Sequence, residues 1–401
     1  MPQTSLRESP WLLSASHSMR QDYLVFGSPF IGDEEIAEVV ASMRSGWLGT
    51  GPKVAEFEHR MAEYKGVRHA VAVNSCTAGV HLSCIGLDIG PGDEVITTAM
   101  TFCASVNAII HSGATPVLAD IDPVTHNIDP REIRRKLTPR TRAVMPVHYA
   151  GRPCDMDAIL AITREHGLLL IEDCAHAIES EWNGQPVGTF GNCGALSFYS
   201  TKNLVTGEGG MILTNDEAVA HRMKNLALHG LTKDAWRRFS DDGYRHYDVV
   251  EVGFKYNMMD LQAAIGMHQI DRLPSMAKRR LEIWNRYSEA FAKLPVNLPA
   301  ALDPAHRHAL HLFTLGIDPE RCGVERDEFM ERLHRRNIGT GVHYRSLPSY
   351  TVYQQKFGWR NEDYPNAFHV GRTTVSLPLS ARLTDEDVEN VIDEVRRALD
   401  P

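Results

Sequence analysis

The sequence contains no long apolar run. No stretch approaches the roughly 20 apolar residues that a transmembrane helix needs, so no membrane span is predicted. The first twenty residues hold only one apolar cluster, Trp11-Leu12-Leu13, which is too short for the core of a signal peptide. We interpret residues 1–22 as an N-terminal extension and predict a cytoplasmic protein.

The chain also lacks an excess of basic residues and a zinc-type cysteine pattern. Its 42 lysines and arginines are outnumbered by 51 aspartates and glutamates, and the net charge of −9 argues against a general nucleic-acid-binding protein. The seven cysteines are odd in number and no pair has zinc spacing, so reduced thiols and no metal site are expected. We interpret Cys76 and Cys174 as small packing residues.

What the chain does have is enough length for two domains. Its 401 residues exceed one ordinary core, and two domains that share a cleft are predicted. Hydrophobic residues make up 43% and charged residues 23%, which is typical of soluble enzymes. We place a large domain at residues 23–275 and a smaller C-terminal domain at residues 276–401.

Apolar segments of strand length alternate with helical patterns through the large domain. This alternation predicts right-handed crossover units around a covered, mostly parallel sheet of seven strands, which is an α/β fold. Residues 231–252 are polar and irregular, so a long loop is expected there. The predicted strands are residues 69–73, 94–98, 116–120, 143–148, 168–172, 195–199 and 210–214.

The pattern changes after the large domain. Residues 260–273 and 276–294 are predicted to form two helices, the second linking the domains. Beyond them a smaller α+β domain is expected. Its predicted strands are residues 311–317, 340–344 and 374–377, and its predicted helices are residues 326–335 and 385–399.

Two residues at strand ends point to the chemistry of pyridoxal phosphate (PLP). Lys202 lies in a polar, glycine-rich turn between two short apolar strands, where a lysine can form a Schiff base with PLP. Asp173 ends an upstream apolar strand, and a carboxylate there can keep the pyridine nitrogen protonated. Either residue alone has an ordinary structural explanation, but PLP chemistry needs both.

Further candidates fall at the same edge of the predicted sheet, where ligands of open α/β folds bind. Residues 74–79 form a strand-to-helix turn in which the N–H groups of Thr77 and Ala78 would hold a phosphate. Phe102 could stack on a flat cofactor, and His176 could lie near the ring oxygen or support Asp173. Taken alone, the turn at residues 74–79 could be an ordinary helix N-cap, and Phe102 could be a core aromatic residue. The occurrence of all these residues at predicted strand ends favours a PLP site.

These residues resemble those of the DegT/StrS group of nucleotide-sugar aminotransferases. The similarity extends from about residue 25 to residue 399, and within the group the chain most resembles the aminotransferases that make UDP-4-amino-4-deoxy-L-arabinose for lipid A modification. The resemblance implies PLP fold type I. The matching segments are residues 45–52, 92–95, 101–102, 146–151, 172–173, 197–198, 202–203, 207–210, 260–264 and 376–378.

The resemblance also implies roles for individual residues. Lys202 would carry PLP, Ser197 would contribute to the phosphate site, and Lys255 would reach the phosphate in the neighbouring subunit of a homodimer with shared active sites. The family usually has Asn at the position of Lys255, and many relatives have Arg at the position of Asn257. A lysine still suits phosphate as a point charge.

The reaction expected from this resemblance moves an amino group from L-glutamate to a UDP-linked 4-keto-pentose and yields 2-oxoglutarate. A 4-keto-6-deoxyhexose nucleotide sugar is the alternative substrate, and a non-catalytic regulatory protein is a further alternative. A sugar 3-dehydratase is disfavoured because relatives of that class replace the lysine by His. The expected sugar or diphosphate contacts are His148, His343, Tyr344 and Arg345.

Overall fold

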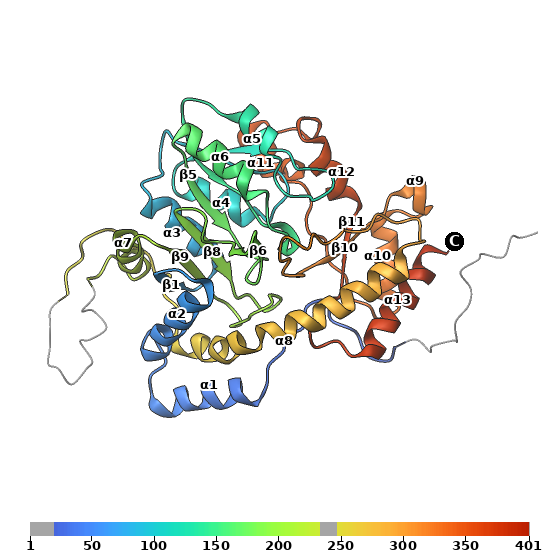
Figure 1. The fold of residues 1–401 in the computed structure, drawn as a ribbon, viewed down its shortest axis with the longest axis horizontal. Helices are drawn as coiled ribbons and strands as arrows, with labels where there is room; N and C mark the ends of the chain where they lie inside the picture. The colour runs from blue at the N-terminus through green and yellow to red at the C-terminus, as the bar shows by residue number, and fades with distance from the viewer. Residues whose placement is uncertain (1–19, 233–246, 401) are drawn as a thin grey trace, which may run out of the picture.

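The computed structural model describes residues 20–232 and 247–400. Its centre is a seven-stranded sheet in the order β1-β9-β8-β5-β4-β2-β3 (Figure 1). β9 is antiparallel to both of its neighbours, and the remaining pairs are parallel. The predicted α/β fold with a mostly parallel seven-stranded sheet is therefore confirmed.

The strands and helices of the sheet region alternate as expected. The strands are β1 (His69–Val73), β2 (Glu94–Thr98), β3 (Thr115–Ala119), β4 (Thr141–Met145), β5 (Leu169–Asp173), β8 (Cys193–Ser197) and β9 (Gly210–Thr214), with a small hairpin of β6 (Glu181–Trp182) and β7 (Gln185–Pro186). The helices are α1 (Asp33–Ser45), α2 (Pro52–Lys65), α3 (Cys76–Gly86), α4 (Cys103–His111), α5 (Pro130–Lys136), α6 (Met156–His166) and α7 (Glu217–Ala227), with a 3₁₀ turn at Tyr149–Gly151.

Helices cover both faces of the sheet because its strands are apolar on both sides. One face packs on α3, α4 and α7, and the other packs on α2, α5, α6 and on α8 (Asp260–Phe291). Successive residues of β5 show the alternation: Leu170 packs with the α5 and α6 side, and Ile171 packs with the α3 and α4 side. Glu172 and Asp173 therefore leave the strand toward opposite faces.

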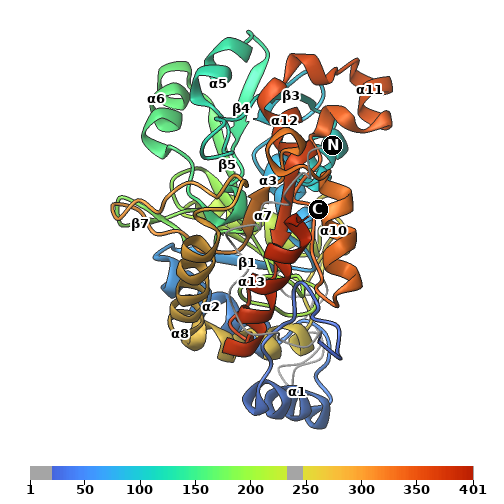
Figure 2. The same ribbon diagram turned by 90° about the vertical axis from the view of Figure 1, so that its right-hand side faces the viewer.

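The C-terminal part is a second, smaller α+β unit with its own core. An antiparallel pair, β10 (Phe313–Gly316) and β11 (Thr374–Leu377), packs with the end of α8 against α10 (Arg326–Arg335) and α13 (Asp385–Leu399). Figure 2 shows α10 and α13 side by side, and the two helices are in contact. The remaining short elements are α9 (Pro319–Cys322), α11 (Thr351–Phe357), α12 (Pro365–Thr373) and 3₁₀ turns at Leu347–Ser349 and Asn361–Asp363.

The two helices predicted at residues 260–273 and 276–294 are one helix, so that prediction is wrong. Pro274 lies inside α8. A proline in a helix interior removes one hydrogen bond and costs about 3 kcal/mol. Here Leu273 and Met276 on either side of it are buried in the core, and their burial offsets that cost. The expected domain boundary at residue 275 lies within this continuous helix.

The strand predicted at residues 340–344 is also wrong. Only Gly341 pairs with a strand, through one isolated bridge to Ser376 of β11. The side chain of His343 bonds to the Ser376 hydroxyl, at 2.8 Å, so the segment is fixed by a side chain instead of a ladder.

The beginning of the described chain lies against the C-terminal unit. Leu24 exchanges backbone hydrogen bonds with Asn337 and Gly339, and the side chain of Asn337 donates to the carbonyl of Arg20. Residues 1–19 of the expected extension, and residues 233–246 of the expected long loop, lie outside the described residues.

All seven cysteines are free, and five of them are buried. In the described ranges no helix combines the length and apolar character that crossing a membrane requires.

Candidate active site

Three strands end at one edge of the sheet and carry the predicted site residues. β1, β5 and β8 run parallel in the sheet, so Val73, Asp173 and Ser197 mark the same edge. β9 begins at this edge, with Gly210 paired to Val73 on one side and to Ser197 on the other. The topology therefore brings the turn after β1, the end of β8 and the turn before β9 together.

The turn after β1 opens helix α3 and presents free amides. Ser75 is the N-cap of α3, and its hydroxyl accepts the N–H of Ala78 at 3.1 Å. The expectation that the Ala78 amide faces a phosphate is therefore wrong, because Ser75 already occupies it. The free donors are the N–H groups of Cys76 and Thr77, the first two residues of the helix, which have no intrahelical acceptor.

Gly210 keeps this turn accessible. A Cβ at Gly210 would lie 2.5 Å from the carbonyl carbon of Ser75 and 2.6 Å from the amide nitrogen of Cys76. Any side chain here would displace the backbone that presents the α3 amides. Gly210 therefore allows the start of β9 to pack closely against the N-terminus of α3. Half-buried Ser197 of β8 is paired with Gly210 and lies beside this turn.

Asp173 is buried and held by donors from two elements. Its Oδ1 accepts the N–H of Ala175 at 3.1 Å, and its Oδ2 accepts the hydroxyl of Ser105, in α4, at 2.8 Å. The thiol of Cys76 lies 3.9 Å from Oδ1. Cys76 was expected to be a packing residue only, and this contact with Asp173 was not predicted. The hydrogen bond from Ser105 to Asp173 was not predicted either.

Lys202 lies in a tight turn that is anchored through the next residue. Its N–H donates to the carbonyl of Tyr199 at 2.9 Å. The side chain of Asn203 donates to Glu179 at 2.8 Å and to the carbonyl of Ala309 at 2.9 Å. Glu179 is paired in turn with Arg280 of α8, and both side chains are buried. The lysine turn is therefore tied to the long helix.

The surroundings of Lys202 favour a neutral amine. Burial lowers the pKa of Lys202 to about 8, while Cys76 and Asp173 act in the opposite direction. Lysine that titrates in this range can act as a nucleophile and as a base near neutral pH. The charge of Asp173 therefore acts on the pKa of Lys202, which places the two side chains in one site.

His176 connects the sheet edge to the C-terminal unit. Its Nδ1 accepts the N–H of Ala150 at 3.3 Å, so the ring proton is on Nε2, which lies 2.9 Å from the Tyr344 hydroxyl. Its ring stacks on Tyr344, with centroids 5.9 Å apart. Both nitrogens are engaged, so His176 does not bond to Asp173, and that part of the expectation is wrong.

Histidines of the C-terminal unit complete this wall. The ring of His311 lies 4.4 Å from that of His176, and its Nδ1 bonds to Asn203 at 3.1 Å. Burial and the charge of Lys202 lower the pKa of His176 and His311 well below their usual range and that of His343 to about 4. The three rings are therefore neutral neighbours of Lys202.

Two aromatic rings lie at the same place. Phe102 is the N-cap residue of α4 and is 57% exposed, which is unusual for a large aromatic side chain next to a buried cluster. Its ring lies 5.9 Å from that of Tyr344. Burial, followed by the charge of Asp173, raises the pKa of Tyr344 well above its usual range, so its hydroxyl keeps its proton.

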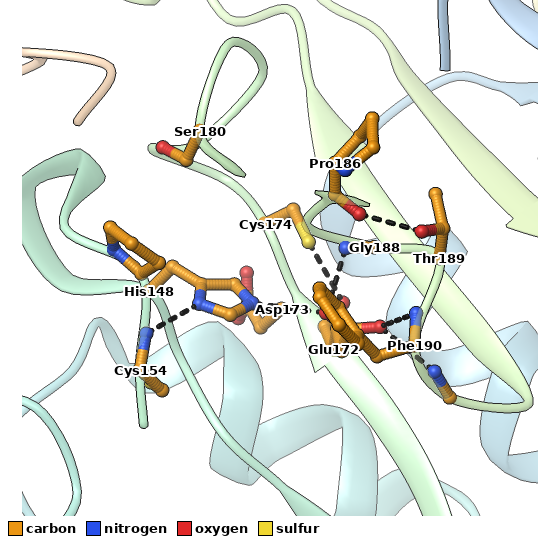
Figure 3. A network of polar contacts seen from close by, with 12 residues as sticks. His148, Cys154, Glu172, Asp173, Cys174, Ser180, Pro186, Gly188, Thr189 and Phe190 are labelled. Carbon is orange, nitrogen blue, oxygen red and sulfur yellow. Dashed lines mark hydrogen bonds and ion pairs between the residues drawn. The ribbon is translucent and has the colours of Figure 1, made fainter. Parts of the chain in front are cut away.

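His148 does not face this site. It has no exposed surface, its Nδ1 accepts the N–H of Cys154 at 3.0 Å, and its Nε2 lies 3.2 Å from Glu172 (Figure 3). The expectation that His148 contacts the sugar is therefore wrong. His148 lies three residues beyond the end of β4, and it bonds there to the other carboxylate of β5.

The cluster of His148, Glu172 and Cys174 has ligand atoms within 4.8 Å of one another, a spacing that would suit a metal ion. The oxygens of Glu172, however, accept backbone N–H groups of the 188–191 loop at 2.7–3.0 Å in addition to His148 (Figure 3). Burial and the neighbouring Glu172 raise the pKa of the Cys174 thiol well above its usual range. This is a filled hydrogen-bond network that fixes the loop to β5.

Arg345 and Lys255 stand apart from the Lys202 group. Arg345 follows Tyr344 but is directed to the other side of the segment, where it lines a hollow of about 420 Å³ with Arg326 and Arg372. Lys255 is exposed, and its carbonyl accepts the side-chain amide of Asn74 beside the α3 turn.

The residues at the sheet edge fit PLP. The free amides at the start of α3 and Ser197 suit its phosphate, and the cradle at Gly210 would be closed by any Cβ. Asp173 retains acceptor capacity for a ring N–H, Phe102 offers an exposed ring, and Lys202 is a lysine of lowered pKa. Each chemical part of the cofactor has a matching group.

Comparison with known proteins agrees with this fit. The chain is 48% identical over 378 residues to the spore coat polysaccharide biosynthesis protein SpsC of Bacillus subtilis, covering 94% of this chain and 97% of SpsC. Spr1654 from Streptococcus pneumoniae in its PLP form superposes with a TM-score of 0.86 at 32% identity, covering 94% of this chain and 98% of that one. Helicobacter pylori PseC, an aminotransferase of pseudoaminic acid biosynthesis, gives 0.86 at 27% identity, covering 94% and 99%.

The fold is thus PLP fold type I, and PLP is the cofactor. The pattern of the DegT/DnrJ/EryC1/StrS aminotransferase family matches residues 29–396, which is nearly the whole described chain. The site geometry, the structural neighbours and this match agree: the chain belongs to the DegT/DnrJ/EryC1/StrS family of PLP-dependent sugar aminotransferases.

Proposed function

We propose that the protein transfers the amino group of L-glutamate to the 4-keto group of a nucleotide-linked sugar. The observation that carries the proposal is the juxtaposition of Lys202 and Asp173 beside the free amides of α3. SpsC and PseC, which belong by their names to polysaccharide and pseudoaminic acid biosynthesis, are similar to this chain and support a sugar substrate. The sugar we propose first is a UDP-linked 4-keto-pentose, which would become UDP-4-amino-4-deoxy-L-arabinose.

In this proposal the chain holds the cofactor by its two ends and its ring. The N–H groups of Cys76 and Thr77 and the Ser197 hydroxyl bind the phosphate, and Asp173 accepts the N–H of the pyridine ring. Phe102 covers a face of the ring. When bound, PLP supplies a protonated ring that takes up the electron pair left at the substrate's α-carbon.

Lys202 moves the protons. Its Nζ, neutral in a large fraction near pH 8, would take the α-proton of glutamate and deliver it to the cofactor carbon that keeps the amino group. The keto sugar is aminated by the same proton transfers in reverse order. His176 and His311 lie beside the amine of Lys202 and are neutral, so they add no positive charge next to it.

For the sugar we assign His343 and Tyr344, which lie beside Lys202 on the C-terminal unit. The Tyr344 hydroxyl accepts from His176, so its own proton is free to be donated to a substrate oxygen. Arg345 faces the separate hollow with Arg326 and receives no sugar contact in this proposal.

We also propose a homodimer with shared sites, in which the exposed Lys255 of the partner subunit binds the phosphate of PLP. A monomer that binds PLP tightly in gel filtration and titration would contradict this part. A 4-keto-6-deoxyhexose remains the second candidate substrate. The residues assigned here contact the cofactor and the reacting keto group, and these contacts do not distinguish one sugar from the other. A non-catalytic regulator would have no use for Lys202 and Asp173 together.

An absorption spectrum in two additions tests the proposal. Protein loaded with PLP is mixed with L-glutamate, freed of glutamate, and then given a UDP-4-keto-pentose. We expect the PLP band to disappear with glutamate and to return with the sugar. Loss without return keeps the glutamate reaction and moves the assignment to a 4-keto-6-deoxyhexose, and no response to glutamate contradicts an aminotransferase.

Lys202→Ala is the matched variant for this experiment. It should fold and should not convert bound PLP to its amino form with glutamate, because the group that moves the proton is absent. An active Lys202→Ala variant would overturn the assignment.

A further inference from the structure

The carboxylate of Asp173 is reached by a short chain of hydroxyl groups from the start of α4. Ser105 Oγ lies 2.8 Å from Asp173 Oδ2, and Thr101 Oγ1 lies 3.0 Å from Ser105 Oγ. All three residues are buried: Thr101 is 3% exposed, Ser105 is 1% exposed and Asp173 is 5% exposed. The chain is therefore shielded from water, where an ordered hydrogen bond has its largest influence.

The direction of this chain follows from the number of protons. An ionised carboxylate can only accept, so the Ser105 hydroxyl donates its single proton to Asp173. The oxygen of Ser105 must then accept from Thr101, which donates. Every hydrogen bond in the sequence Thr101 to Ser105 to Asp173 points toward the carboxylate.

Ser105 differs from Ser83 and Ser288, two other serines inside helices of the chain. Inside a helix, a serine hydroxyl commonly bonds to the carbonyl one turn earlier. Ser83 does this in α3, with the carbonyl of Gly79 at 2.8 Å, and Ser288 does it in α8, with that of Trp284. Ser105 instead leaves its own helix and bonds to a side chain on β5, so its hydroxyl is not needed by α4.

We propose that Ser105, supported by Thr101, is a positioning pair that orients the Asp173 carboxylate toward the ring nitrogen of PLP. Ser105 engages Oδ2 and the Ala175 N–H engages Oδ1, so the plane of the carboxylate is fixed from both oxygens. Without Ser105, only one oxygen of Asp173 has an N–H or O–H donor from the part of the chain that the structure describes. The terminal torsion of the side chain, which is intrinsically broad, is then released. The inference rests on the role given to Asp173 under Proposed function.

The test compares PLP with an analogue that carries a C–H group in place of the ring nitrogen. Equilibrium binding of both compounds to the apoprotein is measured by absorbance or fluorescence titration. Ser105→Ala should weaken PLP binding about tenfold, the size expected for one hydrogen bond to a charged group. Binding of the analogue should change less than about twofold, since it offers Asp173 no N–H.

Thr101 provides the matched pair of variants. Thr101→Val keeps the shape and removes the donor, whereas Thr101→Ser keeps the donor and loses a methyl group. Thr101→Val should weaken PLP about threefold and leave the analogue unchanged, while Thr101→Ser should bind both like the wild type. This pair carries the test by itself where Ser105→Ala fails to fold.

Asp173→Asn separates the failure of this inference from that of the proposed function. If Asp173→Asn weakens PLP and the analogue equally, Asp173 is not the partner of the ring nitrogen and that assignment falls. If Asp173→Asn distinguishes the two compounds but the Ser105 and Thr101 variants weaken both equally, or neither, the positioning inference is overturned and Ser105 is a packing residue.

Discussion

Glu172 and Asp173 are consecutive carboxylates at the end of β5, and their surroundings are opposite. Glu172 lies on the face covered by α2, α5, α6 and α8 and has no exposed surface, whereas Asp173 lies on the face of α3 and α4. Four donors reach Glu172: the N–H groups of Gly188, Phe190 and Gly191 and the ring of His148. Among the described residues Asp173 has two N–H or O–H donors and one long thiol contact.

The difference shows that burial alone does not identify a functional carboxylate. A carboxylate has about four sites at which it can accept. Glu172 has filled them from the protein, so it can take no ligand and serves to hold the 188–191 loop on the sheet. Asp173 has capacity left on the side of Lys202, where a ring N–H would be the missing donor.

Removal of Glu172 should have the largest effect on stability. In Glu172→Ala three backbone N–H groups and His148 lose their buried acceptor, and the free energy of unfolding should fall by about 3–5 kcal/mol. Glu172→Gln, which keeps one acceptor oxygen, should lose about 1–3 kcal/mol. Denaturant unfolding of the apoproteins measures both. Equal midpoints for Glu172→Ala and Asp173→Asn would contradict the assignment of a structural role to Glu172 alone.

Of the two carboxylate variants, Asp173→Asn should have the larger effect on chemistry and the smaller effect on stability. We expect the rate of the glutamate reaction to fall on the order of 100-fold, because the amide cannot stabilise the charged ring nitrogen. The unfolding free energy of the apoprotein should change by about 1 kcal/mol or less. Single-turnover absorbance after glutamate addition gives the rate. A Glu172→Gln enzyme that loses as much rate as Asp173→Asn would remove the distinction between the two carboxylates.

The sheet was predictable because its strands are short apolar runs separated by helices of regular length. β1, β2 and β9 appear at the predicted residues, and α10 and α13 begin and end as expected. Predictions failed where tertiary packing overrode a local signal. Pro274 predicted a helix end, but buried neighbours keep α8 continuous. The segment at residues 340–344 has strand-like residues, yet the pairing edge at β11 is used by Gly341 only.

The site was predictable where strand ends carry unusual residues. Lys202 and Asp173 are placed together by the topology, and the α3 turn lies beside them. His148 was assigned to the wrong face because the sequence shows its proximity to a strand end without showing which way it turns. Ser105 was missed, although a serine four residues after Thr101, in the first turn of the helix that follows β2, is the signal that could have found it.

The lowered pKa of Lys202 should appear in the pH dependence of PLP uptake. Only the neutral amine of Lys202 reacts with an aldehyde, and burial lowers its pKa to about 8. Below this pH the uptake rate should rise about tenfold per pH unit, and above it the rate should level off. An ordinary lysine would continue to gain until a pKa of 10.5. Stopped-flow absorbance of apoprotein with PLP gives the profile.

The variants of the two carboxylates sharpen this profile. Asp173 raises the pKa of Lys202, so Asp173→Asn should move the midpoint below 8. Glu172→Gln should leave the midpoint in place, because Glu172 faces the other side of the sheet and does not contribute to the pKa of Lys202. The facing imidazoles of His176, His311 and His343 are neutral through this range and add no second step. A midpoint near 10.5 in the wild type, or an equal shift in both variants, would show that the lysine does not share its site with Asp173.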